Sequence, residues 1–302
     1  MASDTSLIIT LDRNYLIPAL ILFKNLINNS KGNYKIEFWF SYSVKKSEVM
    51  FFKKITDKLN KTFIVNFHNQ EELQAPGYKY LTSGAWIRLC AMDLPRPDAS
   101  LLIYLDCDLF LKSGWDDFIK TIPREFNSLY ARRTSGHRNF ELKYPSSNKE
   151  SYYFNSGVLF FSPNWWFNSG YSSEWRNILV DYGNLGFKTL DQDLLNYMIR
   201  NHYSALPLEL NSYPNEINFR TKVIHFAGIS KPWGFFQIGS KDCDKFQHEL
   251  IREVKNSYTK NLYSIFFLIF KFGGILGLEL IFKFYLRFTI MNIKNRFNVM
   301  KH

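Results

Sequence analysis

Residues 101–110 constrain the fold more than any other part of the sequence. They begin with five apolar side chains in a row and continue with Asp106, Cys107 and Asp108. An apolar run of this length is typical of a strand in a parallel sheet, because such strands are buried on both faces. Ligands of open α/β sheets bind beyond the carboxyl ends of the strands, so the two acids lie where a ligand is expected.

Asp106 and Asp108 permit two interpretations. Two neighbouring carboxylates repel each other unless a cation lies beside them, and Mg²⁺ and Mn²⁺ accept carboxylate oxygens together with the phosphates of a substrate. The alternative is a strand that ends in a solvated acidic turn, since a short acidic pattern also arises by chance. Cys107 has no second soft ligand near it in the sequence, and we interpret it as a small residue of the turn.

Short apolar segments alternate with helical patterns through the first hundred residues. We expect strands near residues 7–10, 36–40 and 62–67, and helices near residues 16–26 and 47–59. This alternation predicts an α/β fold in which helices cover both faces of a mostly parallel central sheet.

The net charge favours an anionic partner. It is +11 over 302 residues, which suits a nucleic acid, an anionic lipid or a phosphorylated substrate. Residues 240–302 hold 11 Lys and Arg against 5 Asp and Glu. Because this excess lies in a segment rich in apolar side chains, lipid is a better match than nucleic acid.

The cysteines and the N-terminal residues favour a cytosolic protein. The three cysteines are odd in number and widely separated, which argues against a disulfide framework and for a reducing compartment. The first ten residues lack a basic region followed by a long apolar run, so we expect no secretory signal there.

Three polar residues in the first hundred positions have open roles. Asp12 and Asn14 follow the first strand, and they either cap the next helix or contact a nucleotide base or ribose. Arg88 lies among apolar residues of a predicted helix at 80–92, where it either extends to solvent or reaches an acidic site.

Three later segments carry further candidates. Asn155, Ser156 and Gly157 interrupt an apolar strand at 152–161, which suggests a bulge or the close approach of a ligand. Asp191, Gln192 and Asp193 open a helix that Thr189 could cap, and acids suit the first turn of a helix in any case. His225 ends an apolar strand. It is either a core residue or a ligand, and Gly228 and Lys231 follow it.

Taken together, these residues resemble glycosyltransferase family 8, the retaining nucleotide-sugar transferases with a GT-A fold. The resemblance covers residues 6–236 and is greatest to bacterial lipopolysaccharide galactosyl- and glucosyltransferases. It rests on six motifs in order: Asp12-Arg13-Asn14-Tyr15, Arg88, Asp106-Cys107-Asp108, Phe154-Asn155-Ser156-Gly157-Val158, Asp191-Gln192-Asp193, and His225-Phe226-Ala227-Gly228 with Lys231-Pro232-Trp233.

The resemblance implies a metal site and a donor site. Asp106, Asp108 and His225 would hold Mn²⁺, with Mg²⁺ as the alternative ion, and borderline Mn²⁺ does accept oxygen ligands with one imidazole. A UDP-hexose donor would bind to a larger set, in which the first three residues face the uridine. These residues are Thr10, Asp12, Asn14, Arg88, Asp106, Cys107, Asn155, Ser156, Asp191, Gly228 and Lys231.

The resemblance also implies the reaction, which is transfer of galactose or glucose to a saccharide acceptor of bacterial surface glycan: lipopolysaccharide, lipooligosaccharide or capsule. Asp191 and Gln192 are the implied catalytic residues, with Asp191 on the sugar hydroxyls and Gln192 beneath the anomeric carbon. Retention can proceed through a covalent intermediate or on one face of the sugar. We favour the same-face route, because a neutral amide is a poor nucleophile.

The acceptor is the point at which this sequence departs from the family. Some members carry an acid in the strand after the Asp-x-Asp motif, whereas this chain has Arg132 and Arg133. We therefore expect these arginines to meet an anionic or lipid-linked acceptor. Two other functions remain open: a haloacid-type phosphatase, and an inactive membrane-associated scaffold that binds nucleotide sugars.

The expected organisation is a GT-A domain at 1–240 and a basic, aromatic helical region at 241–302. In the latter, Glu279, Lys283 and Arg287 are four residues apart and share one helical face, while Phe and Leu fill the others. Such a helix favours the surface of an anionic membrane, so we expect a cytoplasmic protein attached to the inner face of the cell membrane. The alternative is a helix packed on the catalytic domain or in a dimer interface, and the oligomeric state stays open.

Overall fold

A computed structural model of the chain describes residues 4–60, 62–69, 84–123, 126–134, 153–180, 187, 190–199 and 202–228. These residues belong to the unit Met1–Ile229. Several predicted features lie outside them, namely residues 135–149 of the basic segment, Thr189, Lys231 and the C-terminal region 241–302.

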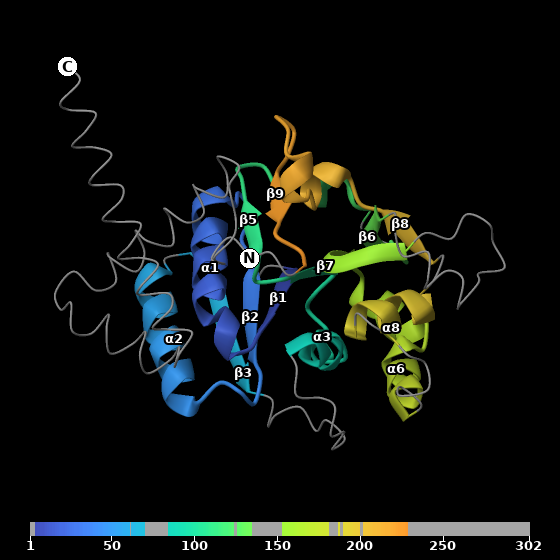
Figure 1. Cartoon of the computed structure of the whole chain (residues 1–302), viewed down its shortest axis with the longest axis horizontal. Coiled ribbons are helices and arrows are strands. Elements are labelled where there is room, and N and C mark those ends of the chain that lie inside the picture. Colours follow the sequence, from blue (N-terminus) through green and yellow to red (C-terminus); the bar gives the residue numbers. More distant parts are fainter. Residues whose placement is uncertain are drawn as a thin grey trace. The chain divides into compact units, whose positions relative to one another are not determined.

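Within the described residues, the main sheet has seven strands in the order β3-β2-β1-β4-β7-β6-β8 (Figure 1). β3, β2, β1 and β4 pair in parallel, as do β6 and β8, whereas β7 runs antiparallel to both of its neighbours. The sheet is therefore mostly parallel, as predicted. Its strands are β1 (Thr5–Leu11), β2 (Lys35–Phe40), β3 (Ile64–Asn69), β4 (Leu101–Leu105), β6 (Leu129–Thr134), β7 (Tyr153–Phe161) and β8 (Tyr203–Ala205).

Helices cover both faces of this sheet (Figure 1). α1 (Leu16–Asn29) and α2 (Lys46–Leu59) lie on one side. The other side carries α3 (Gly84–Met92), α5 (Pro163–Asn168), α6 (Tyr171–Val180) and α8 (Leu190–Ile199). Short 3₁₀ helices are η1 (Arg13–Tyr15), η3 (Asp117–Thr121), η4 (Leu208–Leu210) and η5 (Pro214–Glu216).

The apolar runs form strands because both faces of the sheet are covered. Side chains alternate between faces along a strand, so Leu7 and Ile9 of β1 join the cluster that includes Phe23 of α1. Ile8 points the other way and joins the cluster that includes Trp86 of α3. In a strand with two buried faces both sets of side chains lie in apolar surroundings, which explains the apolar run Leu7-Ile8-Ile9 of β1.

The apolar run predicted as a strand before the two acids is β4, and the structure adds a second strand after them that the sequence did not predict, β5 (Leu109–Leu111). The turn between them consists of Asp106, Cys107 and Asp108, and β5 pairs with β9 (Val223–His225) in a separate antiparallel sheet. The two acids therefore lie between two sheets. None of the described helices combines the length and apolar character that crossing a membrane requires.

A buried ion pair fixes β2 to the segment that precedes β4. Both carboxylate oxygens of Glu37 accept hydrogen bonds from Arg96, at 2.9 Å from Nε and 2.6 Å from Nη2. Burial alone would raise the pKa of Glu37, but the Arg96 guanidinium outweighs it and lowers this pKa below its ordinary value. The pair therefore stabilises the fold at pH values above the unfolded-state pKa of Glu37. This stabilisation is lost as the pH falls through the folded-state pKa of Glu37.

We predict that Glu37→Gln destabilises the fold by about 3–5 kcal/mol, because it leaves the buried guanidinium without its counter-charge. Urea denaturation at neutral pH measures this loss. The matched control is Asp117→Asn, which removes an exposed carboxylate that pairs with Lys31 and Lys120 and should leave the unfolding midpoint unchanged. A Glu37→Gln midpoint equal to that of the wild type would contradict the prediction.

Candidate functional site

The Asp106–Asp108 turn is held by main-chain hydrogen bonds to two distant segments. Asp106 N donates to Gly157 O of β7 at 2.8 Å, and Phe226 N donates to Asp108 O at 3.0 Å. β5 pairs with β9 so that Leu109 lies opposite His225. Ladder hydrogen bonds therefore bring His225 to the two acids across more than a hundred residues of sequence.

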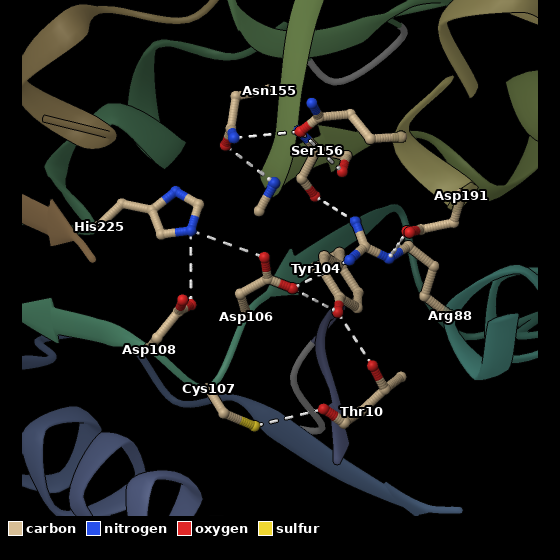
Figure 2. Close-up of polar contacts among 12 residues, drawn as sticks. Thr10, Arg88, Tyr104, Asp106, Cys107, Asp108, Asn155, Ser156, Asp191 and His225 are labelled. Carbon is tan, nitrogen blue, oxygen red and sulfur yellow. Dashed lines mark hydrogen bonds and ion pairs between the residues drawn. The ribbon is translucent and has the colours of Figure 1, made fainter. Parts of the chain in front are cut away.

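Asp106, Asp108 and His225 form a cluster that could hold a metal ion (Figure 2). His225 Nε2 lies 3.7 Å from Asp106 Oδ2 and 3.4 Å from Asp108 Oδ1, and one ligand atom from each residue lies within 4.8 Å of the others. Two carboxylate oxygens and one imidazole nitrogen form a donor set that suits Mn²⁺. The structure thus brings together all three residues predicted as metal ligands.

Gly157 lies so close to this cluster that it leaves no room for a side chain. A Cβ atom at this position would be 2.2 Å from His225 Cε1 and 2.7 Å from Asp106 Oδ2. The β7 backbone therefore forms one wall of the candidate metal site. This close approach explains why a glycine interrupts an otherwise apolar strand.

Two side chains occupy the other oxygen of Asp106. Tyr104 donates to Asp106 Oδ1 at 2.7 Å, and Arg88 Nη2 donates to the same atom at 3.1 Å. Tyr104 also bonds Thr10 Oγ1 at 2.9 Å. With Oδ1 occupied, Oδ2 is the oxygen that faces His225, which orients the carboxylate for one-oxygen coordination.

Arg88 joins this carboxylate to a second acid. It points into the site, where its guanidinium donates to Ser156 O at 2.6 Å and lies 2.6 Å from Asp191 Oδ2 (Figure 2). Burial, opposed by the charge of Arg88 and reinforced by that of Asp106, raises the pKa of Asp191 to about 6. Of the two interpretations of Arg88, contact with an acidic site is therefore the correct one.

Gln192, in the first turn of α8, lies against a bulge in β7. The ladder with β6 shifts from Ala131–Leu159 to Arg132–Asn155, so residues 156–158 of β7 have no partner on β6. Of the two alternatives predicted for this segment, the bulge is therefore present. Gln192 Oε1 accepts from Ser156 N at 3.0 Å and Asn155 Nδ2 at 3.1 Å. Its Nε2 donates to Tyr153 Oη at 3.2 Å.

The turn after β1 contacts the acidic turn through its backbone. Cys107 Sγ donates to Thr10 O at 3.3 Å, and burial followed by the charges of Asp106 and Asp108 raises the pKa of this thiol. Cys107 is thus a neutral, buried residue of the turn, as interpreted from the sequence. Asp12 accepts from Asn14 N at 2.8 Å and caps η1, so the capping role is present and a nucleotide contact remains a prediction.

The side chain of Arg132 bonds to other residues of the protein, whereas the sequence predicted that it contacts an acceptor. Its side chain is buried, donates to Glu216 Oε1 at 2.7 Å and lies over the Tyr213 ring at 3.6 Å. The neighbouring Arg133 is exposed. Gly228 is also exposed and has a positive φ of 89°, which suits the predicted turn after β9.

Sequence reasoning missed Tyr104, Tyr153 and Asn211. Tyr104 carries a weak signal, because its hydroxyl is the one polar group within the apolar run that precedes Asp106. Tyr153 and Asn211 gave none, since each acts through a partner that is distant in sequence: Gln192 for Tyr153 and His225 for Asn211.

Comparison with known proteins identifies relatives along most of the chain. The family described as glycosyl transferase family 8 matches residues 6–236. A lipopolysaccharide 1,2-glucosyltransferase of Escherichia coli is 22% identical over 273 residues, which cover 84% of this chain and 76% of the relative.

Solved structures share the fold. The galactosyltransferase LgtC in complex with donor and acceptor sugar analogues has a TM-score of 0.67 at 14% identity, and the match covers 82% of this chain and 95% of that one. The bifunctional glycosyltransferase WbbM has a TM-score of 0.63 at 19% identity, with 83% and 50% covered. These likenesses confirm the predicted GT-A fold.

We predict that Gly157→Ala weakens binding of Mn²⁺ by at least about tenfold, because the added methyl group displaces His225 or Asp106 from its position. Calorimetric titration with Mn²⁺ measures this effect. The control is Gly32→Ala, where a Cβ would be 2.3 Å from Oη of Tyr34, a residue that does not belong to the metal cluster. It should lower stability without changing the affinity. Unchanged Mn²⁺ affinity in Gly157→Ala would contradict the prediction that Gly157 lines a metal site.

Proposed function

The chain belongs to glycosyl transferase family 8, and from this premise we propose that it transfers galactose or glucose from UDP to a saccharide acceptor of bacterial lipopolysaccharide, with retention of configuration. The observation that carries the proposal is the convergence of Asp106, Asp108 and His225 beside the buried Arg88–Asp191 pair. Family membership removes the haloacid-type phosphatase as an alternative. The names of the Escherichia coli relatives support the choice of acceptor.

A divalent cation fits the three-residue cluster, and we propose Mn²⁺. Asp108 and His225 are buried, and Tyr104 with Arg88 turns Asp106 so that one of its oxygens faces His225. When bound, the ion supplies Lewis-acid stabilisation for a departing diphosphate. Gly228 and Lys231 are the proposed contacts to the phosphates, and Thr10, Asp12 and Asn14 are the proposed contacts to the uridine.

Asp191 and Arg88 are proposed to hold the donor sugar. An ionised Asp191 accepts hydrogen bonds from sugar hydroxyls, and Arg88 keeps that carboxylate in place at 2.6 Å. Asn155 and Ser156 belong to the β7 bulge on the same side of the site and complete the proposed contacts to the sugar. This combination of rigid polar groups is what positioning of an anomeric carbon requires.

Gln192 is proposed to stabilise positive charge rather than to form a bond. Its Oε1 already accepts from Ser156 N and Asn155 Nδ2, so its lone pairs are engaged, and a neutral amide is a weak nucleophile. On the proposed same-face route, the bond from the anomeric carbon to the phosphate oxygen breaks and the bond to the acceptor oxygen forms. The acceptor proton passes to the departing phosphate.

The charge of the chain supports a reaction at a membrane surface. Residues 240–302 hold 11 Lys and Arg against 5 Asp and Glu among many apolar residues. We propose that this region attaches a cytoplasmic catalytic domain to anionic lipid of the inner membrane face, where a lipid-linked, anionic acceptor is present. Of the two arginines of β6, Arg133 is the exposed one, and we propose it as a contact to such an acceptor.

The first test measures UDP release from a panel of UDP-sugars in Mn²⁺ or EDTA. We expect one UDP-hexose to be turned over only with Mn²⁺, and Asp108→Asn to reduce this rate by about 100-fold or more, because it removes a ligand charge. Asp98→Asn, an exposed acid outside the site, is the control and should behave as wild type. Folded protein that binds UDP and Mn²⁺ without turnover, even with acceptor, would favour the inactive scaffold.

The second test follows pH. The pKa of Asp191 is raised to about 6, so below that pH its carboxylate gains a proton, loses its negative charge and accepts less strongly from sugar hydroxyls. We expect kcat/KM, which reports the free enzyme, to fall about tenfold per pH unit below pH 6. Asp191→Asn should be less active and should lack this limb. An identical acidic limb in Asp191→Asn would assign the titration to another group.

A further inference from the structure

A continuous set of hydrogen bonds, buried as far as Asn155 and partly buried at Gln192, joins His225 to Gln192 through Asn211 and Asn155. We propose that Asn211 is a positioning residue: it holds His225 in the tautomer that can bind a metal and links it to the amide beneath the sugar. The inference rests on the function proposed above. Asn211 is fully buried and had no predicted role.

Two backbone N–H groups of the β7 bulge determine how the amides are oriented. Gly157 N donates to Asn155 Oδ1 at 3.0 Å, and a backbone N–H can only donate, so that atom of Asn155 must be the oxygen. Ser156 N donates to Gln192 Oε1 at 3.0 Å, which fixes the Gln192 amide in the same way. Asn155 Nδ2 then donates to Gln192 Oε1 at 3.1 Å, in agreement with both assignments.

The orientation of Asn211 follows from that of Asn155. The atom of Asn211 that lies 3.0 Å from Asn155 Oδ1 must be the donor, Nδ2. Its other atom, Oδ1, therefore faces His225 Nδ1 at 2.8 Å. Because an amide oxygen only accepts, Nδ1 must carry a hydrogen, and a neutral imidazole then has its lone pair on Nε2. Nε2 is the atom that faces Asp106 and Asp108.

The main chain around Asn211 is fixed as well. Arg132 donates from its guanidinium to Asn211 O, while Glu216 and the Tyr213 ring hold the guanidinium itself. The next residue, Ser212, accepts from His225 N at 2.8 Å. Arg132 therefore acts by keeping Asn211 opposite His225. This structural role, and not contact with an acceptor, accounts for the burial of Arg132.

Two substitutions separate the two contacts of Asn211. Asn211→Ala removes both of them. Asn211→Asp keeps an oxygen that accepts from His225 Nδ1–H, but it places a second oxygen against Asn155 Oδ1 and so breaks the link toward Gln192. The inference thus predicts that these variants differ in metal affinity, although both lose part of the link to the donor site.

The test is calorimetric titration with Mn²⁺ in the absence of donor. We expect a Kd about 10–100-fold weaker for Asn211→Ala, the range for loss of a group that orients a metal-bound histidine. Asn211→Asp should bind Mn²⁺ at least as tightly as the wild type, yet its kcat should fall. The matched control is Thr56→Ala, since Thr56 is equally buried but its hydroxyl donates within α2, to Phe52 O and Lys53 O.

Two results would overturn the inference. One is Mn²⁺ affinity in Asn211→Ala equal to that of the wild type. The other is equal weakening in Asn211→Ala and Asn211→Asp, which would indicate general damage to the site. Absence of Mn²⁺ binding in the wild type would instead overturn the proposed metal site, and this inference with it.

If Asn211→Ala does not fold, a measurement of the His225 tautomer in the wild type tests the inference instead. Histidine-selective ¹⁵N labelling of the metal-free protein identifies the protonated nitrogen of His225, with His225→Ala to assign its resonances. A proton on Nδ1 supports the inference, and an unprotonated Nδ1 overturns it.

Discussion

Repulsion between Asp106 and Asp108 is the constraint on which the rest of the site depends. Asp108 is buried and Asp106 is largely enclosed, so water screens their charges poorly. The surrounding groups counter this repulsion. Arg88 and Tyr104 donate to one oxygen of Asp106, while His225 faces the other. A cation bound among the acids and the imidazole would complete the compensation, which is why the arrangement favours metal-dependent chemistry over a purely structural turn.

The antiparallel strand β7 connects this charge cluster to the sugar side of the proposed site. Gly157 lies against His225 and Asp106, whereas the two residues before it contact Gln192. A regular strand would turn alternate side chains away from the site. The bulge opposite Arg132 relaxes that alternation and exposes consecutive backbone N–H groups to side chains. The β7 bulge thus contacts both the candidate metal ligands and the side-chain amides of Asn155 and Gln192.

The polar network has an energetic cost that the apolar clusters must offset. Arg88, Asp191, Asn155 and Asn211 are all buried, and removing such groups from water is unfavourable unless each finds partners. The contacts described for them reduce this cost and also limit each group to one orientation. The two apolar clusters, one on each face of the sheet, supply the rigid support that such a network needs.

The sequence by itself determined the fold class and most strand and helix positions, offered a bulge as one of two alternatives at Asn155–Gly157, and through a family resemblance pointed to Asp106, Asp108 and His225 as one cluster. These features are local, because they follow from apolar periodicity and from motifs along the chain. Only the tertiary structure decided the antiparallel direction of β7, the pairing of β5 with β9, the inward role of Arg132 and the contacts of Tyr104 and Asn211. Each depends on partners far away in sequence, such as Asn155 and Asn211. No pattern of neighbouring residues records such a contact, because strand pairing and side-chain packing create it when the chain folds.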